Sequence, residues 1–211
     1  ANLEGIYLSE GDLRGANMRE TLLRSGIFDR TQLSHAVLVS ANATSANFAG
    51  ADMRFSDLSY GIFENAVLSN ARVSSASLYA VNLHNAQLLR TDLSRTDMRD
   101  ARLEHAVLSF ASLEQTDLSS ARLEDANLTG AQCKGTIFLD ADLKNADFRG
   151  ANLAGAVLRG AETDGANLTG ADLRGTLGMT SQRVCSALNG GTALMDPDLS
   201  AEVQVRCGSS R

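Results

Sequence analysis

The chain has 211 residues with a net charge of −6, and 44% of its residues are apolar, which is typical of one folded domain and excludes a disordered chain. No stretch of 18 apolar residues occurs, so we expect no membrane-spanning helix, and the first ten residues lack the regions of a signal peptide, although one removed before Ala1 would leave no trace. The acidic charge argues against direct nucleic-acid binding by neutralisation of phosphates.

A five-residue period runs without insertion or deletion from residue 1 to about residue 175. Every fifth residue from Leu3 to Leu173 gives 35 positions, of which Leu fills 23, and the residue two earlier is Ala at 23 positions. An α-helix repeats every 3.6 residues and a strand every 2, so neither explains a period of five. A short extended side followed by a corner does, because residues two apart in an extended segment point the same way.

We therefore expect the large and the small residue of each pentad to face inward and the other three to face outward. Between Gly130 and Gly175 the fifth residue is usually Gly, which favours a type II turn with positive φ. Earlier pentads carry Glu, Ser, Asn or Arg there, so we expect their corners to differ. Among the inward residues, Cys133 is expected to be a buried free thiol and Thr163 to donate a hydrogen bond to a backbone carbonyl.

The pentads ANLTG, ADLKN, ANLAG and ADLRG, which begin at residues 126, 141, 151 and 171, follow the pattern A(D/N)LXX. The chain thereby resembles the pentapeptide repeat family over roughly five sixths of its length. The resemblance implies an all-β solenoid, a right-handed quadrilateral β-helix with four pentads per coil. At about nine coils and about 4.8 Å between stacked strands, the rod would be about 42 Å long, with an interior filled by side chains and no ligand channel.

The pattern changes after the last pentad, where two helix start signals occur. Thr180 or Ser181 is suited to cap a helix through SQRVCSAL, which Asn189 and two glycines would end. Asp196 at the N-cap and Pro197 at the first helical position predict a second helix through PDLSAEVQVR. Two such helices would shield the unpaired edge of the last coil, and a frayed tail is the alternative.

We accordingly divide the chain into a β-helix at 1–175 and a C-terminal helical cap at 176–211. Cys185 and Cys207 fall one in each expected helix region, and a disulfide between them resembles the bracketed two-helix cap of some lumenal and exported family members. Such a bridge would close a loop of about 22 residues and stabilise by about 3 kcal/mol. It favours an oxidising compartment, namely the periplasm, the extracellular space or the thylakoid lumen, and the alternative is a cytoplasmic protein with two reduced cysteines.

No phosphate-binding, dinucleotide-binding or HExxH motif occurs, so we expect no enzyme and no catalytic, cofactor-binding or metal-ligating residues. His84 and His105 lie about one coil apart and are interpreted as solvated turn residues, because a convex rod offers no cleft around them. We expect instead a rigid interaction scaffold whose protein partner is unknown. Ala1 is already in register, so that end either continues upstream or pairs with another chain, as in a homodimer through the uncapped N-terminal edge.

Charge is uneven around the expected rod, since every 20 residues return to the same side. The adjacent sides that hold Met98 and Leu103 carry 14 acidic and 7 basic residues. They present one candidate partner surface, formed by Glu104, Glu124, Asp125 and Asp117. The resemblance adds an alternative function here, because some family members bind DNA gyrase by imitating duplex DNA and give resistance to gyrase poisons. Duplex DNA, however, carries about 25 charges over about 42 Å, which is far more than the excess of acidic over basic residues on these two sides.

Outward apolar residues form a second candidate partner surface. It consists of Leu89, Val107 and Phe110, which share one side of the expected rod. Scattered apolar residues are normal on a protein surface, but a cluster at or beside a corner favours a contact with a partner.

Overall fold

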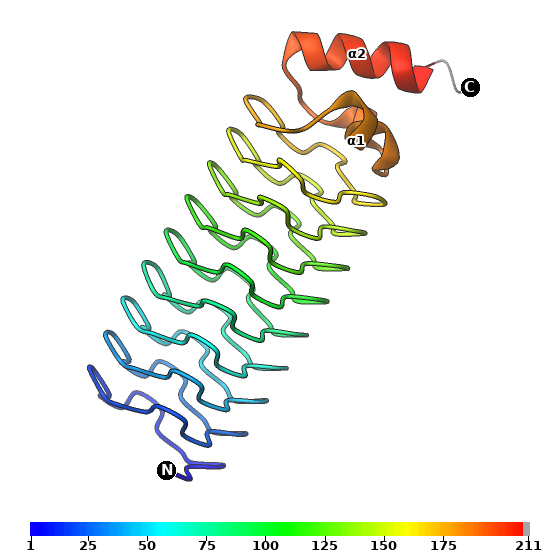
Figure 1. Ribbon diagram of the computed structural model, residues 1–211. Coiled ribbons are helices and arrows are strands. Elements are labelled where there is room, and N and C mark those ends of the chain that lie inside the picture. Colours follow the sequence, from blue (N-terminus) through cyan, green and yellow to red (C-terminus); the bar gives the residue numbers. More distant parts are fainter. Residues whose placement is uncertain (209–211) are drawn as a thin grey trace.

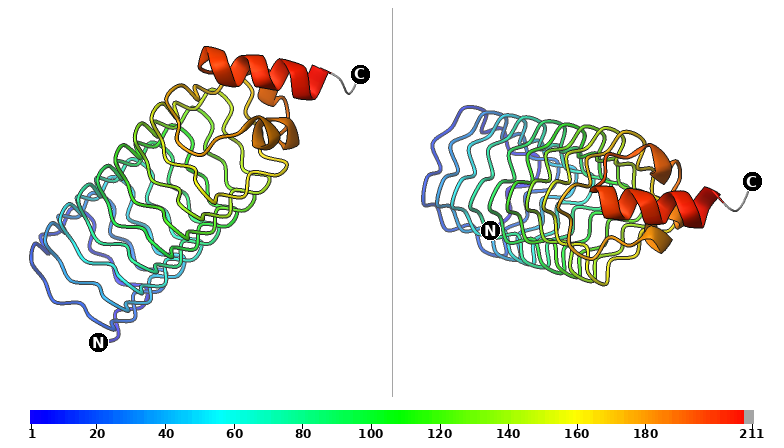
Figure 2. Two further views of the ribbon diagram at one scale, coloured as in Figure 1. Left: turned by 45° about the horizontal axis from the view of Figure 1, so that its top comes forward. Right: turned by 90° about the horizontal axis from the view of Figure 1, so that it is seen from above.

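The structure is a computed structural model that describes residues 1–208. The repeats form a rod of stacked coils, and the helical segments lie at its C-terminal end (Figure 1). They are α1 (Ser181–Ser186), the 3₁₀ helix η1 (Gly190–Thr192) and α2 (Pro197–Gly208). Figure 2 shows the successive coils and α2 crossing the end of the rod. Within the described residues, none of the helices has the length and hydrophobicity that a membrane crossing requires.

Backbone hydrogen bonds join each coil to the next at a constant spacing of 20 residues. The residue before each core position forms a parallel bridge with its counterpart one coil later, as Arg102 does with Arg122. The Leu103 N–H donates to the carbonyl of Arg122 at 2.7 Å, and the Arg122 N–H donates to the carbonyl of Ala101 at 2.9 Å. Because a side leaves one bridged residue between two corners, the extended sides within residues 1–208 are isolated bridges and not longer strands.

The corners do not differ along the rod, contrary to the expectation from their sequences. Eleven of the 35 corners are Gly, with φ from 62° to 72°, and the other 24 have φ from 52° to 60°. Even the bulky Phe55, Tyr60 and Phe110 adopt this left-handed conformation. Coils that stack in one register must all close the same turn, so the ladder imposes a conformation that costs a non-Gly residue about 1–2 kcal/mol.

The large and small residues of the pentads form one continuous core, as predicted. Leu103, Leu123 and the alanines two residues before them are fully buried. The rings of Phe28 and Phe48 stack with their centroids 4.9 Å apart. A threonine at the small position reaches back to the preceding coil, as when the Thr136 hydroxyl donates to the carbonyl of Leu113 at 2.6 Å.

The hydrogen bond expected for Thr163 is absent. Its Oγ1 is buried and has no hydrogen-bond partner within the described residues. In the repeats, the threonines whose hydroxyls donate to a backbone carbonyl occupy the small position, whereas Thr163 occupies the large position. This unsatisfied oxygen lies at the side of the last coil that faces α1.

The cap continues the ladder on part of the last coil. Thr180 is confirmed as the N-cap of α1, since its hydroxyl accepts a hydrogen bond from the Arg183 N–H at 3.4 Å. α1 ends at Ser186, earlier than predicted, because Leu188 is instead extended and forms a parallel bridge with Asn167.

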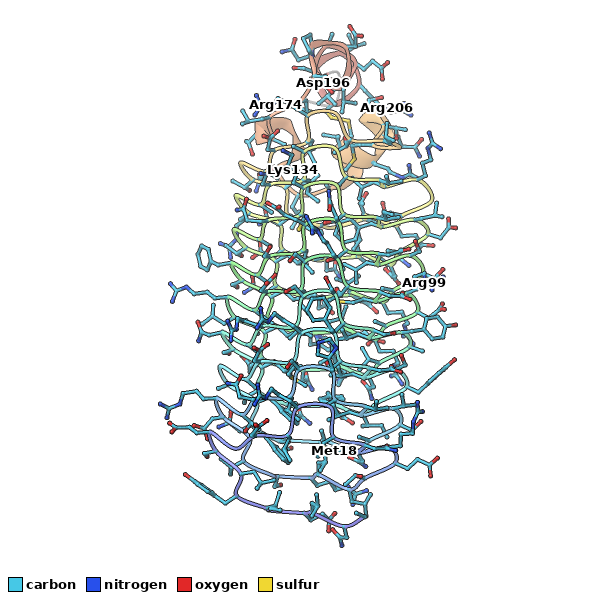
Figure 3. All side chains as sticks on the ribbon, turned by 90° about the vertical axis from the view of Figure 1, so that its left-hand side faces the viewer. Met18, Arg99, Lys134, Arg174, Asp196 and Arg206 are labelled. Carbon is cyan, nitrogen blue, oxygen red and sulfur yellow. A yellow bond between two sulfur atoms is a disulfide. The ribbon has the colours of Figure 1, made fainter. Side chains whose placement is uncertain are left out.

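Asp196 connects the cap to the rod. Its carboxylate, predicted to cap α2, accepts a hydrogen bond from the Gly175 N–H at 2.7 Å. In the coil below, the equivalent Gly155 N–H donates to the carbonyl of Arg174 at 2.9 Å. The Asp196 carboxylate therefore takes the place of a backbone carbonyl from a further coil. Figure 3 labels Asp196 and Arg174 where the rod meets the cap.

A disulfide joins Cys185 of α1 to Cys207 of α2, with Cα atoms 5.7 Å apart. Cys133 is a free thiol buried in the core, and burial raises its pKa to about 12. Residues 209–211, which the predicted cap included, lie outside the described residues.

The core assignment predicts opposite effects for two neighbouring substitutions. Leu123 is fully buried, so Leu123→Asp places a charge in the core and should destabilise by more than about 4 kcal/mol or prevent folding. Glu124 points outward, so Glu124→Ala should change the free energy of unfolding by less than about 0.5 kcal/mol. Thermal unfolding of both variants measures this, and equal melting temperatures would contradict the register.

The cysteine assignment predicts a pattern of alkylation. Without reductant, the native protein should take up no iodoacetamide, because a thiol with a raised pKa in the core holds little reactive thiolate. One alkylated cysteine, Cys133, should appear after unfolding, and three after unfolding with reductant, as counted by mass spectrometry. Three alkylated cysteines without reductant would mean that Cys185 and Cys207 are not joined.

Candidate functional site

The 20-residue register places the predicted partner residues on defined sides of the rod. We call the two sides that hold Met98 and Leu103 the acidic sides, and the residues Leu89, Val107 and Phe110 the Phe110 cluster. Glu104, Glu124 and Asp125 lie on the Leu103 side, and Asp117 lies on the Met98 side, as the bridges show.

Glu104 is not an exposed charge. Only 6% of the residue is accessible to solvent. Its Oε1 lies 3.0 Å from Nε of Arg122 and 3.7 Å from Nε of Arg102, and its Oε2 is buried without a hydrogen-bond partner among the described residues. The two arginines stand one above the other in the neighbouring column and cover the carboxylate, so a partner would meet their guanidinium groups first.

The other predicted acids differ in their availability. Asp117 is half-buried and accepts a hydrogen bond from the Ser119 hydroxyl at 2.6 Å. Asp125 is exposed, with its carboxylate 3.8 Å from Nδ1 of His105. Glu124 is half-buried and has no ion pair within the described residues. Of the four predicted acids, Glu104 is therefore the one that is paired with arginine, and Asp117, Glu124 and Asp125 have no ion pair with lysine or arginine among the described residues.

A repeated Asp-x-Arg contact neutralises further acids. The aspartate before a core residue accepts hydrogen bonds from the backbone N–H and the guanidinium of the arginine two residues later, as Asp97 does from Arg99 at 3.3 and 2.8 Å. Hydrogen bonds from Arg99 hold the pKa of Asp97 below its usual range. The same backbone bond explains why Asp and Asn recur at this position, since either side chain accepts it.

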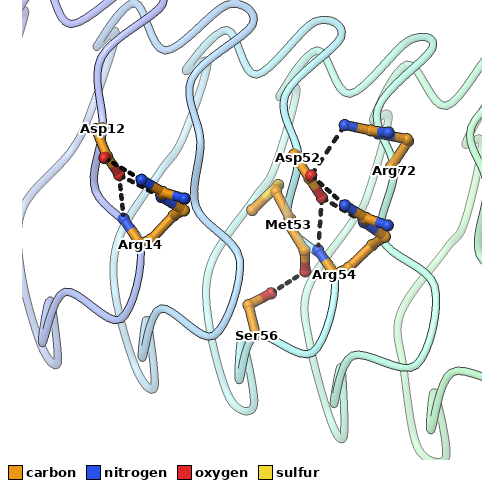
Figure 4. Close-up of polar contacts among 7 residues, drawn as sticks. All are labelled: Asp12, Arg14, Asp52, Met53, Arg54, Ser56 and Arg72. Carbon is orange, nitrogen blue, oxygen red and sulfur yellow. Dashed lines mark hydrogen bonds and ion pairs between the residues drawn. The ribbon is translucent and has the colours of Figure 1, made fainter.

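Asp52 is the most enclosed of these aspartates (Figure 4). It is 3% exposed, and its Oδ2 lies 2.7 Å from Arg54 and 2.9 Å from Arg72. The hydrogen bond from Arg54 is the main cause that lowers its pKa. Charge on the rod is therefore paired within and between neighbouring coils.

The Phe110 cluster brings an exposed ring and two half-buried aliphatic side chains together on one side. Phe110 is 56% exposed, and Leu89 and Val107 are half-buried. The Phe110 ring lies against Gly130, where a Cβ atom would come within 2.6 Å of the ring. The Arg90 guanidinium lies 5.9 Å from the ring centroid. The exposed ring is held in place because it packs against Gly130, which has no side chain, in one neighbouring coil and lies beside the Arg90 guanidinium of the other.

His84 and His105 are neighbours, with ring centroids 5.4 Å apart in an edge-to-face arrangement. Nδ1 of His84 is buried without a hydrogen-bond partner among the described residues. In that part of the chain, no group of three or more His, Cys, Asp or Glu side chains is arranged to hold a metal ion.

Three exposed aromatic residues, Tyr7, Phe55 and Tyr60, were not among the predicted partner residues. Phe55 is 55% exposed and stacks on His35 with ring centroids 5.1 Å apart. It lines a hollow of about 340 Å³ together with Arg54, Ser75 and Arg95. Its place at the fifth position of a pentad is the sequence signal that identifies it, because every corner residue points outward.

Comparison with known protein families identifies the five-residue repeat. The family model for pentapeptide repeats matches this chain in eight copies, whose overlapping ranges together extend from residue 1 to residue 175. A comparison with curated proteins finds no match.

Several solved structures are similar to this chain. One is HetL, a pentapeptide repeat protein involved in heterocyst differentiation regulation from the cyanobacterium Nostoc sp. Strain PCC 7120, at 24% identity over 90% of this chain and 87% of that chain, with a TM-score of 0.46. Another is QnrB1, a plasmid-mediated fluoroquinolone resistance protein, at 16% identity over 99% and 100%, with a TM-score of 0.44. A third is Rfr23 from the cyanobacterium Cyanothece 51142, at 31% identity over 51% and 61%, with a TM-score of 0.33.

Pentapeptide repeat proteins fold as right-handed quadrilateral β-helices and are structural or binding proteins, not enzymes. The family match extends over the whole repeated part of this chain, from residue 1 to residue 175. The chain therefore belongs to the pentapeptide repeat family.

Proposed function

We propose that this chain is a rigid scaffold that binds a protein partner through its outer surface. The observation that carries the proposal is the unbroken 20-residue register, which holds outward side chains at fixed spacing on a rod whose interior is filled by Leu, Phe and Ala. Such a surface suits contact with another protein better than small-molecule chemistry, because repeat stacks resist deformation and present extended faces.

The Phe110 cluster is the surface that we assign to this partner. An exposed aromatic ring that is already held in place loses little side-chain freedom on binding. Aromatic residues and arginines are also those that most often dominate protein interfaces, and Arg90 adjoins the ring. The acidic sides are less suited, because arginines cover Glu104. A homodimer through the N-terminal edge stays a prediction.

A topoisomerase-binding function is the second candidate, and the excess of acids on two adjacent sides favours it. Against it stands the pairing of five of those 14 acids with lysine or arginine. Asp97 is bound to Arg99, and Lys144 contacts both Asp142 and Glu162. DNA carries about one unpaired charge per 1.7 Å of its axis, and a surface with internal counterions imitates that poorly.

The Phe110 assignment is tested with the partner captured from the native source. Phe110→Ala should weaken binding about tenfold or more, as for a central interface residue, and Gly130→Ala should weaken it by displacing the ring. Leu139→Ala removes an apolar side chain that is 40% exposed on another side and should leave the affinity unchanged.

Salt distinguishes the two surfaces in the same binding measurement. Contact through the Phe110 cluster should persist or strengthen as the salt concentration rises. Contact through Glu124 and Asp125 should weaken, because the Debye length falls from about 30 Å at 0.01 M to about 3 Å at 1 M. An affinity that ignores Phe110→Ala and falls with salt would contradict the Phe110 assignment.

The topoisomerase candidate predicts inhibition of DNA gyrase supercoiling. We expect no inhibition and no protection from a quinolone at micromolar protein, because basic residues interrupt the acidic sides and pair with several of their acids. Inhibition that disappears when Glu124 and Asp125 are both replaced by Lys would instead establish this second function and displace the first.

A further inference from the structure

The ladder stops on one side of the last coil. Segments of the cap form parallel bridges with the other three sides, where Leu177 pairs with Val157, Leu188 with Asn167, and Leu194 with Asp172. The fourth side, residues 161–165, faces α1 and has no bridge to it. A helix uses most of its backbone N–H and C=O groups internally, so α1 offers this side one acceptor, the Ser186 carbonyl, to which the Gly165 N–H donates at 3.2 Å, and does not complete the ladder.

Thr163, at the centre of that side, is left with unused hydrogen-bonding groups. In the coil below, the N–H of the equivalent Leu143 donates to the carbonyl of Glu162 at 2.8 Å. The Thr163 N–H donates to no backbone group within residues 1–208, and its Oγ1 is buried without a partner there. Among the described residues, the Thr163 N–H is therefore a free backbone donor at the end of the ladder, whereas Oγ1 is enclosed by protein.

A pocket of about 370 Å³ lies between this side and α1. It exists because Thr163 is shorter than the leucine that usually fills the large position, and because a helix lies above it where other sides have an extended segment. The walls are small or polar. They are formed by Gly160, Ala161, Glu162, Thr163, Asp164, Thr180, Gln182, Arg183 and Ser186.

The walls carry two acids, Glu162 and Asp164, and one base, Arg183. Asp164 has no hydrogen bond or ion pair from its carboxylate within the described residues, and Glu162 is already paired with Lys144. Arg183 donates from Nη1 to the carbonyl of Gly178 and has no carboxylate within 4 Å in that part of the chain. The pocket thus holds one available carboxylate and one guanidinium with unused N–H groups.

We propose that this pocket binds a small zwitterionic α-amino acid, with its carboxylate on Arg183 and its ammonium group on Asp164. A guanidinium is the preferred partner of a carboxylate because its N–H groups match the two oxygens, and a ligand that carries both charges matches the one unpaired carboxylate and the one guanidinium of the pocket. The Thr163 N–H provides a further donor toward the ligand carboxylate. Thr180, Gln182 and Ser186 favour a polar side chain over an aromatic one.

The disulfide supports this site. Cys185 lies in α1 between Arg183 and Ser186, and its bond to Cys207 ties the roof of the pocket to α2. Reduction should therefore weaken ligand binding while the coils below, which contact only their neighbours, stay folded.

The test is a titration of the oxidised full chain with L-glutamine, followed by the NMR signals of backbone amides. Saturable shifts are expected at 160–164 and 180–186. N-acetylglutamine, which lacks the ammonium charge, and glutamine amide, which lacks the carboxylate, should each bind at least tenfold more weakly. Asp164→Asn and Arg183→Gln should cause similar losses.

Glu124→Gln is the matched control, because Glu124 lies on the same side two coils below and does not line the pocket. It should leave binding unchanged. Asp164 is exposed, so Asp164→Asn remains informative if Arg183→Gln loosens α1. Absence of saturable shifts with any of the common amino acids at about 10 mM, a concentration that detects millimolar affinity, would overturn the proposal and leave a water-filled pocket. Equal binding of glutamine and its two capped forms would also overturn it.

Discussion

The structure depends on the parallel hydrogen bonding of each coil to the next in one constant register. This register forces all 35 corners into the left-handed region, 24 of them at residues other than Gly. Each such corner costs about 1–2 kcal/mol. The same pentad buries one large side chain, which contributes about 1.5–3 kcal/mol, and makes several backbone hydrogen bonds at about 0.5–1.5 kcal/mol each. The stabilisation from stacking one pentad therefore exceeds the backbone strain at its corner. The identity of the corner residue is consequently not restricted to Gly and can serve contacts on the outer surface.

The register also determines how charge is distributed on the surface. Residues 20 apart stand one above the other, and residues two apart meet across a core residue, so most acids have a basic neighbour in one of these directions. Asp52 has both, in Arg72 and Arg54. The acidic sides consequently present a weaker negative potential to a partner than the number of their acids indicates. The Phe110 ring packs over the corner at Gly130. It is a more distinctive contact site for a partner than the paired charges.

The irregular features of this protein lie where the stack of coils ends and the C-terminal cap begins. Asp196 supplies the acceptor that another coil would have offered to Gly175, and extended residues of the cap continue three sides. On the fourth side, the helix that carries Cys185 leaves Thr163 unsatisfied, and a polar pocket lies between that side and the helix. The scaffold and the pocket are thus separate consequences of one principle: a coil is complete only where another backbone segment lies against it.

The sequence by itself determined the repeat and the inward and outward positions, because these follow from local periodicity. It narrowed the first N-cap of the cap to Thr180 or Ser181 through capping chemistry, and it suggested the pairing of Cys185 with Cys207 only through resemblance, with two reduced cysteines as the alternative. It did not determine the common geometry of the corners, since propensity assigns Glu or Phe no left-handed preference and only stacking imposes one. Nor did it reveal that Glu104 is covered by Arg102 and Arg122, or that Thr163 lacks a partner. Those outcomes depend on which side chains stand one coil away and on where the ladder is interrupted, and the tertiary structure decides both.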